Sequence, residues 1–144
     1  MNHYERIDRP MQAPVIADPE AGLLYRGLSR FARLWALQQG RLVSSRLEGA
    51  LGRSIRCEST EGEVVDLCLR REKLEFETDG TLRTPHASIR MVPTDWSRVL
   101  SGELHVMAII LAGRAPFPKD QRRLLMQFSM LLQTTVLSKG PDRE

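Results

Sequence analysis

The stretch MVPTDWSRVLSGELHVMAIILAGRAPFPKDQRRLLMQFSMLL, residues 91–132, predicts three helices separated by two glycines. A strand ends at Pro93, and Thr94 or Asp95 can cap the first helix because their side-chain oxygens accept hydrogen bonds from its first N–H groups. Gly102 follows that helix, at a position where glycine is common. We therefore expect a short first helix between residues 94 and 101.

The second and third helices of this stretch differ in how their apolar residues are distributed. The second, within residues 103–112, is apolar almost all round from Val106 onward and is ended by Gly113, which predicts a buried helix. After a link, Asp120 can cap the third helix. The third helix carries a single apolar stripe, formed by Leu124, Leu125, Phe128, Leu131 and Leu132. Such an amphipathic helix needs other elements to cover its apolar side.

Upstream of this stretch, residues 54–92 alternate between apolar and polar side chains, which predicts four strands. Their inward positions are Ile55, Cys57, Val65, Leu67, Leu69, Leu74, Phe76, Ala87, Ile89 and Met91. Polar residues at the alternate positions indicate an antiparallel sheet with one face in water. Residues 20–52 carry helical apolar stripes, with a break at residues 38–40.

The order of elements predicts an α+β fold, in which N-terminal helices precede an antiparallel meander sheet of four to five strands. The C-terminal helices are expected to cover one face of that sheet. We expect one domain at residues 21–138, because a chain of 144 residues has the length of a single domain. Residues 1–20 hold three prolines and are expected to form a flexible arm, and residues 139–144 a tail.

The spacing DxxxxLxxGxLxxxxxxLxGxxxxxxD followed by an apolar helix resembles the C-terminal half of the sterol carrier protein type 2 family. The matching residues are Asp95, Leu100, Gly102, Leu104, Leu111, Gly113 and Asp120. The resemblance covers residues 46–137 and implies the same fold, with a last strand at residues 114–119. That link contains Pro116 and Pro118, which departs from a strand because proline cannot donate to a sheet.

The resemblance also implies a function, the non-catalytic binding or carrying of an apolar lipid such as a sterol, a fatty acyl chain or an isoprenoid or quinone intermediate, without a cofactor. The lipid would lie in a cavity between sheet and helices. The candidate lining residues are Trp96, Leu100, Leu104, Met107, Ile110, Leu111, Leu125, Phe128 and Leu132. From the residues alone, a packed core is the commoner explanation of these side chains, and the cavity is what the resemblance implies. The alternative is therefore a protein-interaction scaffold, or an accessory factor of a lipid or quinone biosynthetic complex, with a filled core.

Motifs of enzymes and metal sites are missing from the sequence. His3, His86 and His105 stand apart, with no HxxxH or HExxH pair, and there is no GxSxG or GxGxxG motif. Cys57 and Cys68 lack the spacing of metal ligands, and whether they pair across a hairpin stays open. We expect neither catalysis nor a bound metal.

Charge is unevenly placed along the chain. Residues 22–56 contain seven arginines and one acidic residue, and Arg26, Arg30 and Arg33 share one side of the predicted helix. That basic side, with Phe31 and Trp35 on the apolar side, can rest on anionic lipid headgroups. Nucleic-acid binding is the less favoured interpretation because few aromatic residues accompany the arginines. Without a long apolar segment or a signal-peptide core, we expect a cytoplasmic protein, with peripheral membrane contact and a homo-oligomer or enzyme partner as alternatives.

Overall fold

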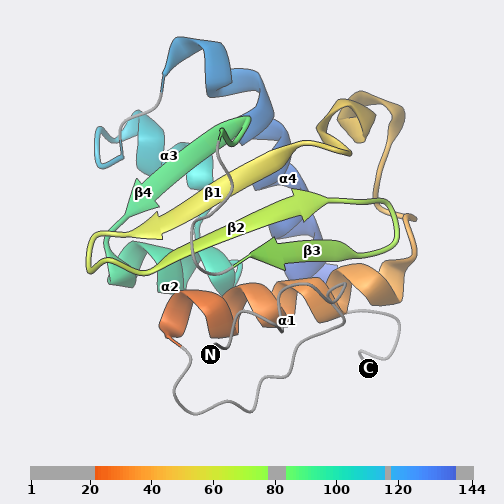
Figure 1. Cartoon of the computed structure of the whole chain (residues 1–144), viewed down its shortest axis with the longest axis horizontal. Coiled ribbons are helices and arrows are strands. Elements are labelled where there is room, and N and C mark those ends of the chain that lie inside the picture. Colours follow the sequence, from red (N-terminus) through yellow and green to blue (C-terminus); the bar gives the residue numbers. More distant parts are fainter. Residues whose placement is uncertain (1–21, 78–83, 116–117, 139–144) are drawn as a thin grey trace.

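The computed structural model describes residues 22–77, 84–115 and 118–138. The helices are α1 (Leu23–Gln38), η2 (Ser45–Ala50), α2 (Pro93–Leu100), α3 (Val106–Leu111), η3 (Lys119–Gln121) and α4 (Arg122–Ser138). The strands are β1 (Ser54–Ser59), β2 (Val64–Leu69), β3 (Leu74–Glu77) and β4 (Ala87–Met91). The α+β fold and all four strands predicted from alternation are confirmed (Figure 1).

The sheet has the strand order β3-β2-β1-β4 and is mixed. Antiparallel pairs join β1 to β2 and β2 to β3, whereas β4 lies parallel to β1, with Ile55 opposite Ala87 and Cys57 opposite Ile89. The expected meander is wrong in this detail, because β4 crosses to the far edge beside β1 instead of turning back along β3. Alternation within a strand reports which face is buried but carries no information on which strand lies beside it.

A fifth strand is not seen among the described residues. Arg114, Ala115, Pro118 and Lys119 are not in a strand, and residues 116–117 lie outside the described ranges. The N–H group of Ser88 on β4 donates instead to the side-chain oxygen of Gln121 at 3.0 Å. The expected arm and tail, residues 1–20 and 139–144, also lie outside the described ranges.

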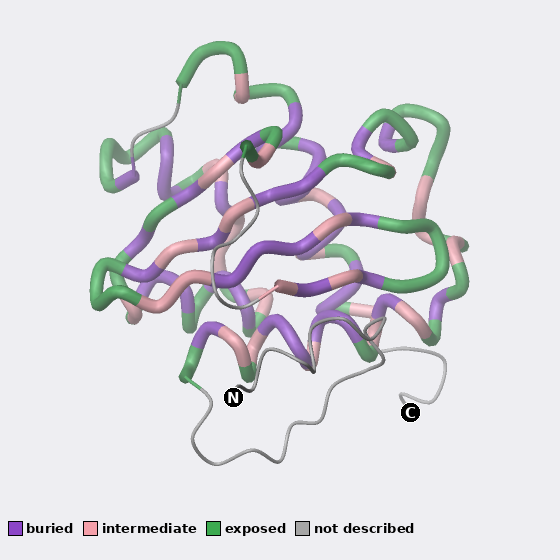
Figure 2. Tube along the Cα trace, in the orientation of Figure 1, coloured by how far each residue is buried: buried purple, intermediate pink, exposed green. Residues whose placement is uncertain are grey.

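The helices gather on one face of the sheet and close a single core. In Figure 1, α3 and α4 lie behind the sheet and α1 runs along its lower side, in contact with α2 and α4. Inward-facing strand residues are buried, whereas turns are exposed (Figure 2). Three aromatic rings link the two longest helices, since Phe31 meets Trp35 at 5.8 Å and Phe128 at 6.3 Å between ring centroids.

Two of the predicted helix caps are wrong. Val92 is the N-cap residue of α2 and Pro93 its first residue, so Thr94 and Asp95 lie inside the first turn. Proline is favoured there because its fixed φ suits a helix and its missing N–H would be unpaired anyway. Asp120 sits in the 3-10 turn η3, which begins after Pro118, rather than at a cap. The predicted second N-terminal helix is the shorter 3-10 helix η2.

Candidate functional site

The predicted lipid-lining residues separate into a buried group and a peripheral group. Six of them are at most 6% exposed, namely Trp96, Leu100, Ile110, Leu125, Phe128 and Leu132. Trp96, Leu125 and Phe128 are 0% exposed, so neighbouring residues enclose these three side chains. The indole N–H of Trp96 donates to the carbonyl oxygen of Glu58 at 2.7 Å, which joins α2 to β1.

The peripheral group lies along α3. Leu104 and Met107 are half-buried and pack against the core together with Met130 of α4. Leu111 is 80% exposed, which corrects the expectation that it faces an interior cavity. The all-round apolar sequence of this segment gave no sign of which side would be covered. We define the apolar flank as Leu104 and Met107, which belong to the predicted site, together with Met130; all three are apolar, half-buried and packed against the core.

A serine–histidine contact fastens α3 to α4. The hydroxyl of Ser129 lies 2.5 Å from Nδ1 of His105 and accepts the N–H of Val106 at 3.1 Å. His105 is the N-cap residue of α3, and its Nδ1 accepts the N–H of Met107. Burial lowers the pKa of His105, which favours the neutral ring that this pattern of hydrogen bonds requires. We name this contact the α3 latch.

The α3 latch is structural and not a nucleophile with its base. Ser129 is 1% exposed, so a substrate cannot approach its hydroxyl in this structure. The sequence analysis missed Ser129, although a serine between the buried Phe128 and Leu131 was a signal that a polar partner had to be nearby.

A second polar contact holds the segment after α3. Arg114 forms an ion pair with Asp95, whose side chain is 2% exposed while that of Arg114 is 49% exposed. Asp95, one of the residues that carry the family resemblance, thus tethers the end of α3 to the first turn of α2. The α3 latch and this ion pair therefore hold α3 at both of its ends.

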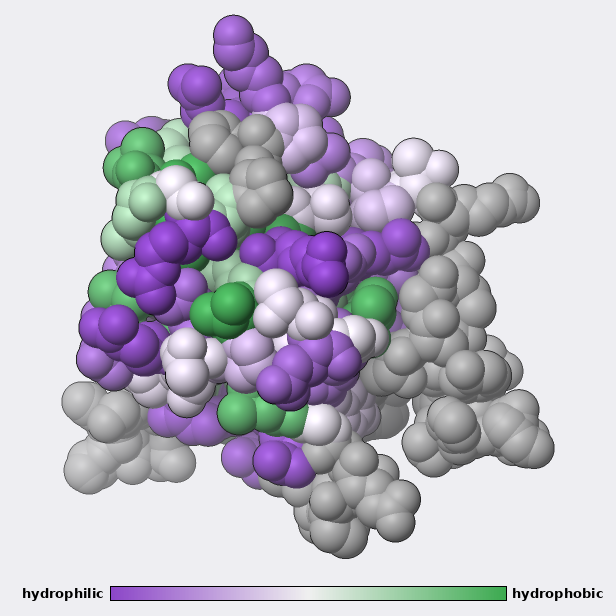
Figure 3. Space-filling model, turned by 90° about the vertical axis from the view of Figure 1, so that its left-hand side faces the viewer, coloured by the Kyte–Doolittle hydropathy of each residue, from purple (hydrophilic) through white to green (hydrophobic). Residues whose placement is uncertain are grey.

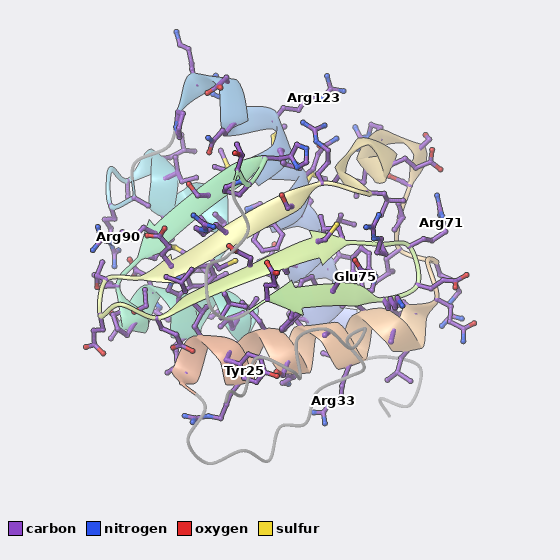
Figure 4. All side chains as sticks on the ribbon, viewed as in Figure 1. Tyr25, Arg33, Arg71, Glu75, Arg90 and Arg123 are labelled. Carbon is purple, nitrogen blue, oxygen red and sulfur yellow. The ribbon has the colours of Figure 1, made fainter. Side chains whose placement is uncertain are left out.

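The basic side of α1 is only partly available. Arg26 and Arg33 are exposed, and Figure 4 shows Arg33 pointing away from the sheet. Arg30 is half-buried and donates to the carbonyl oxygen of Leu100 at 3.5 Å. Phe31 and Trp35 are buried in the core, which corrects the expectation that they could face a membrane beside the arginines.

The other face of the sheet carries charged side chains and one cysteine. Arg56 on β1 pairs with Asp66 on β2 through two hydrogen bonds of 2.8 and 3.0 Å. Cys57 is buried toward the helices while Cys68 lies on the opposite side of the sheet, so the two thiols do not pair. Within the described ranges, no three histidine, cysteine or acidic side chains are close enough to hold a metal ion.

Neither a membrane-spanning helix nor a relative found by sequence helps to identify the site. No helix in the described part of the chain is long and apolar enough to cross a bilayer. Neither a scan against models of known protein families nor a search of curated proteins gives a match.

Solved structures do match. A Thermus thermophilus protein, titled possibly sterol carrier protein, has a TM-score of 0.54 and 13% identity, over 80% of this chain and 88% of that chain. Apo sterol carrier protein 2 from Yarrowia lipolytica has a TM-score of 0.51 and 9% identity, over 80% and 95%. A protein titled "UbiJ-SCP2 Ubiquinone synthesis protein" has a TM-score of 0.52 and 13% identity, over 73% and 94%. At these identities the likeness concerns architecture, and this chain has the fold of sterol carrier protein 2.

Proposed function

We propose that this chain binds an apolar lipid without catalysing a reaction, and that the lipid enters at the apolar flank, between α3 and α4. The ligand class is a sterol, a fatty acyl chain or an isoprenoid or quinone intermediate. The observation that carries the proposal is the flank itself, where Leu104, Met107 and Met130 are half-buried and continuous with the buried core. The titles of the matched structures support it by analogy of fold.

The buried residues would become the deep part of the site once α3 moves. Trp96, Leu125 and Phe128 are fully enclosed, so a chain of methylene groups can reach them only by displacing a neighbour. The six residues of α3 are the obvious neighbour, because a helix this short is marginal by itself and depends on its packing. Methionine at positions 107 and 130 suits a wall that changes shape, since its thioether chain is flexible and polarizable.

A binding experiment tests this proposal. Purified protein is delipidated, titrated with a fluorescent long-chain fatty acid and then analysed by native mass spectrometry for bound lipid. The variant Met107→Asp places a charge on the flank and should weaken binding about tenfold, because it removes one apolar contact and adds a desolvation cost. Val43→Asp is the matched control, since Val43 is also half-buried against the core but lies between α1 and η2.

Two outcomes would contradict lipid binding at this flank. Wild-type protein that carries no lipid and does not bind the fatty acid would rule out the function. Equal losses in both variants, each with an unchanged circular dichroism spectrum, would place the site elsewhere.

The burial of the predicted lining residues favours a second candidate, an interaction scaffold or accessory factor in a biosynthetic complex. Trp96, Leu125 and Phe128 are fully buried, and a protein that acts only through its surface needs no internal binding space. One matched structure is titled as a ubiquinone synthesis protein. Deleting residues 1–20 and measuring mass by light scattering tests whether that segment assembles subunits. A mass change together with absent lipid binding would support the scaffold, and a monomer with and without the segment would count against it.

A further inference from the structure

Helix α3 is unusual because it is apolar on all sides yet stands partly in solvent. From Val106 to Gly113 its sequence, VMAIILAG, contains no polar side chain. Val106, Ile109 and Ile110 face the core, whereas Ala108, Leu111 and Ala112 are exposed on one side. A helix that is apolar all round is normally buried in protein or in lipid. We name the exposed residues Ala108, Leu111, Ala112 and Gly113 the α3 knob.

Basic residues follow the α3 knob in the sequence. Four of the residues between 112 and 123 are basic, Arg114, Lys119, Arg122 and Arg123, and one is acidic, Asp120. All five are exposed. In Figure 3 hydrophobic side chains gather at the upper left, at the height of α3 in Figure 1, below a hydrophilic crest at the height of η3 and the start of α4. Figure 4 shows Arg123 at the upper end of the molecule, far from Arg33 on α1 and on the side away from α3.

The exposure of the α3 knob favours a lipid bilayer as its partner over a protein with a binding groove. Gly113 has φ +77°, which turns the chain sharply, and a Cβ placed there would meet nothing within 4 Å. Leu111 is 80% exposed, more than any other large apolar side chain in the described part of the chain. An exposed apolar helix end followed by exposed basic residues matches the interface of an anionic bilayer, where apolar residues enter the acyl boundary and cations meet headgroups.

We propose that the α3 knob is a membrane-docking surface, which inserts Leu111 into the interface of an anionic lipid bilayer while Lys119 contacts the headgroups. This surface differs from the basic side of α1, whose neighbouring aromatic residues are buried in the core. Docking through α3 would bring the apolar flank to the membrane. The inference goes beyond the proposed function, since a protein could dock in this way whether or not it extracts a lipid.

Co-sedimentation of the full chain with vesicles tests the proposal. Two vesicle types are used, phosphatidylcholine alone and phosphatidylcholine mixed with phosphatidylserine. We expect wild-type protein to bind the mixed vesicles more tightly and to be released by salt. Leu111→Asp should lower the partition coefficient at least about tenfold, because it removes the inserted side chain. Lys119→Gln should lower it about fivefold on the mixed vesicles only. Arg123→Gln removes a charge on the side of the molecule away from α3 and should leave it unchanged.

Matched controls lie on α1. Leu37→Asp alters an apolar side chain that is 44% exposed on a different helix and should leave binding unchanged. Arg26→Gln with Arg33→Gln removes the two exposed arginines of the basic side of α1 and should have little effect. Because Leu111 is so exposed, the Leu111→Asp variant should keep its melting temperature, which circular dichroism checks.

Three results would overturn the proposal. The first is wild-type protein that binds neither vesicle type. The second is Leu111→Asp protein that binds as the wild type does. The third is loss of binding in the α1 variants with retention in Leu111→Asp, which would assign docking to α1. The lipid-binding titration in solution is a separate measurement, so failure of the proposed function and failure of the docking surface are distinguishable.

Discussion

Glu63 caps a helix to which it does not belong. Its carboxylate accepts the N–H groups of Leu24 at 3.0 Å and Tyr25 at 2.8 Å, in the first turn of α1. The N-cap residue Gly22 has no side chain to do so, and the same carboxylate fills the space that a Cβ at Gly22 would need. A charged acceptor at a helix start gains both hydrogen bonds and a favourable interaction with the helix dipole.

Replacing Glu63 by alanine should therefore destabilise the protein by about 1–2 kcal/mol, in the range of a lost N-cap. Urea denaturation followed by circular dichroism measures the loss. Glu61→Ala is the control, because Glu61 is exposed in the same turn. Equal effects of the two substitutions would show that the turn, and not the cap, is what matters.

His105 makes stability depend on pH. Its Nδ1 acts as an acceptor for the N–H of Met107 and the hydroxyl of Ser129, which requires the neutral ring. Burial lowers the pKa of His105 below its ordinary value near 6.5, so the folded protein binds this proton less readily than the unfolded chain. Its stabilising contribution is complete above about pH 6.5 and is lost as the pH falls below that value toward the lowered pKa.

We therefore expect the free energy of unfolding to decrease below about pH 6.5, with a smaller decrease in His105→Asn protein. Urea midpoints measured at several pH values between 8 and 5 provide the comparison. At pH 8 the two proteins should differ by a constant offset only. The same slope in both proteins would mean that other groups cause the pH dependence.

The close crossing of α1 and α2 depends on one glycine. A Cβ added at Gly27 would collide with the side chain of Leu100, whose Cβ and Cγ would also lie only 3.3 and 3.2 Å away. Because several atoms of Leu100 are involved, the strain cannot be relieved by moving the tip of the side chain alone. The glycine is therefore what allows these two helices to approach each other.

Gly27→Ala should destabilise the protein by about 1–3 kcal/mol through overpacking, despite the better helix propensity of alanine. The matched control is Gly49→Ala in η2, where the nearest atom would be Nε2 of Gln127 at 3.5 Å, an ordinary contact. Thermal unfolding of both variants provides the test. A Gly27→Ala protein as stable as the wild type would show that Leu100 can repack freely.

At the scale of elements, the sequence predicted what depends on periodicity and missed what depends on neighbours. Alternation at Val65, Leu67 and Leu69 identified β2 because inward positions recur every second residue. The same signal could not show that β4 would pair in parallel with β1, because the alternation within a strand does not depend on which strand lies beside it. Asp95 is of a residue type common at helix caps, which is why it was predicted to be one. Its actual partner, Arg114, lies nineteen positions further along the chain, where no local pattern could indicate the pairing.

For the molecule as a whole, local stability should vary with the number of neighbours that each element has. Strand β1 is paired on both sides, by β2 and β4, whereas α3 is short and exposes one face. Regions with few buried contacts open at lower free energy than the core. Opening of α3 is also what entry of a lipid at the apolar flank would need.

Hydrogen exchange measured by mass spectrometry tests this gradient. We expect amides of α3 to exchange faster than those of α4, and amides of β1 to be the slowest. Ser129→Ala should increase exchange in α3 while leaving β1 unchanged, because it removes one half of the α3 latch. Uniform exchange across all elements would indicate that the protein opens only by global unfolding.

The sequence allowed us to predict which apolar residues belong to the candidate site, but not which of them are exposed to solvent. Trp96, Leu125 and Phe128 were identified as apolar residues of the helical half and are indeed buried. Whether they surround a ligand or one another is decided by packing, which no residue pattern records. Leu111 shows the limit most clearly, since a leucine in an all-apolar segment gives no sign that it will face solvent.

The pairing of α1 with α4 has a consequence during synthesis. Phe31 meets Phe128, and the side-chain amide of Gln38 donates to the hydroxyl of Ser138 at 3.0 Å, so the first helix described is completed by the last. While the polypeptide is being translated, the apolar side of α1 has nothing to pack against on this flank until α4 leaves the ribosome. A premature stop codon after α3 would leave that side uncovered, and such a truncated product should be a substrate for chaperones and proteases instead of a smaller working protein.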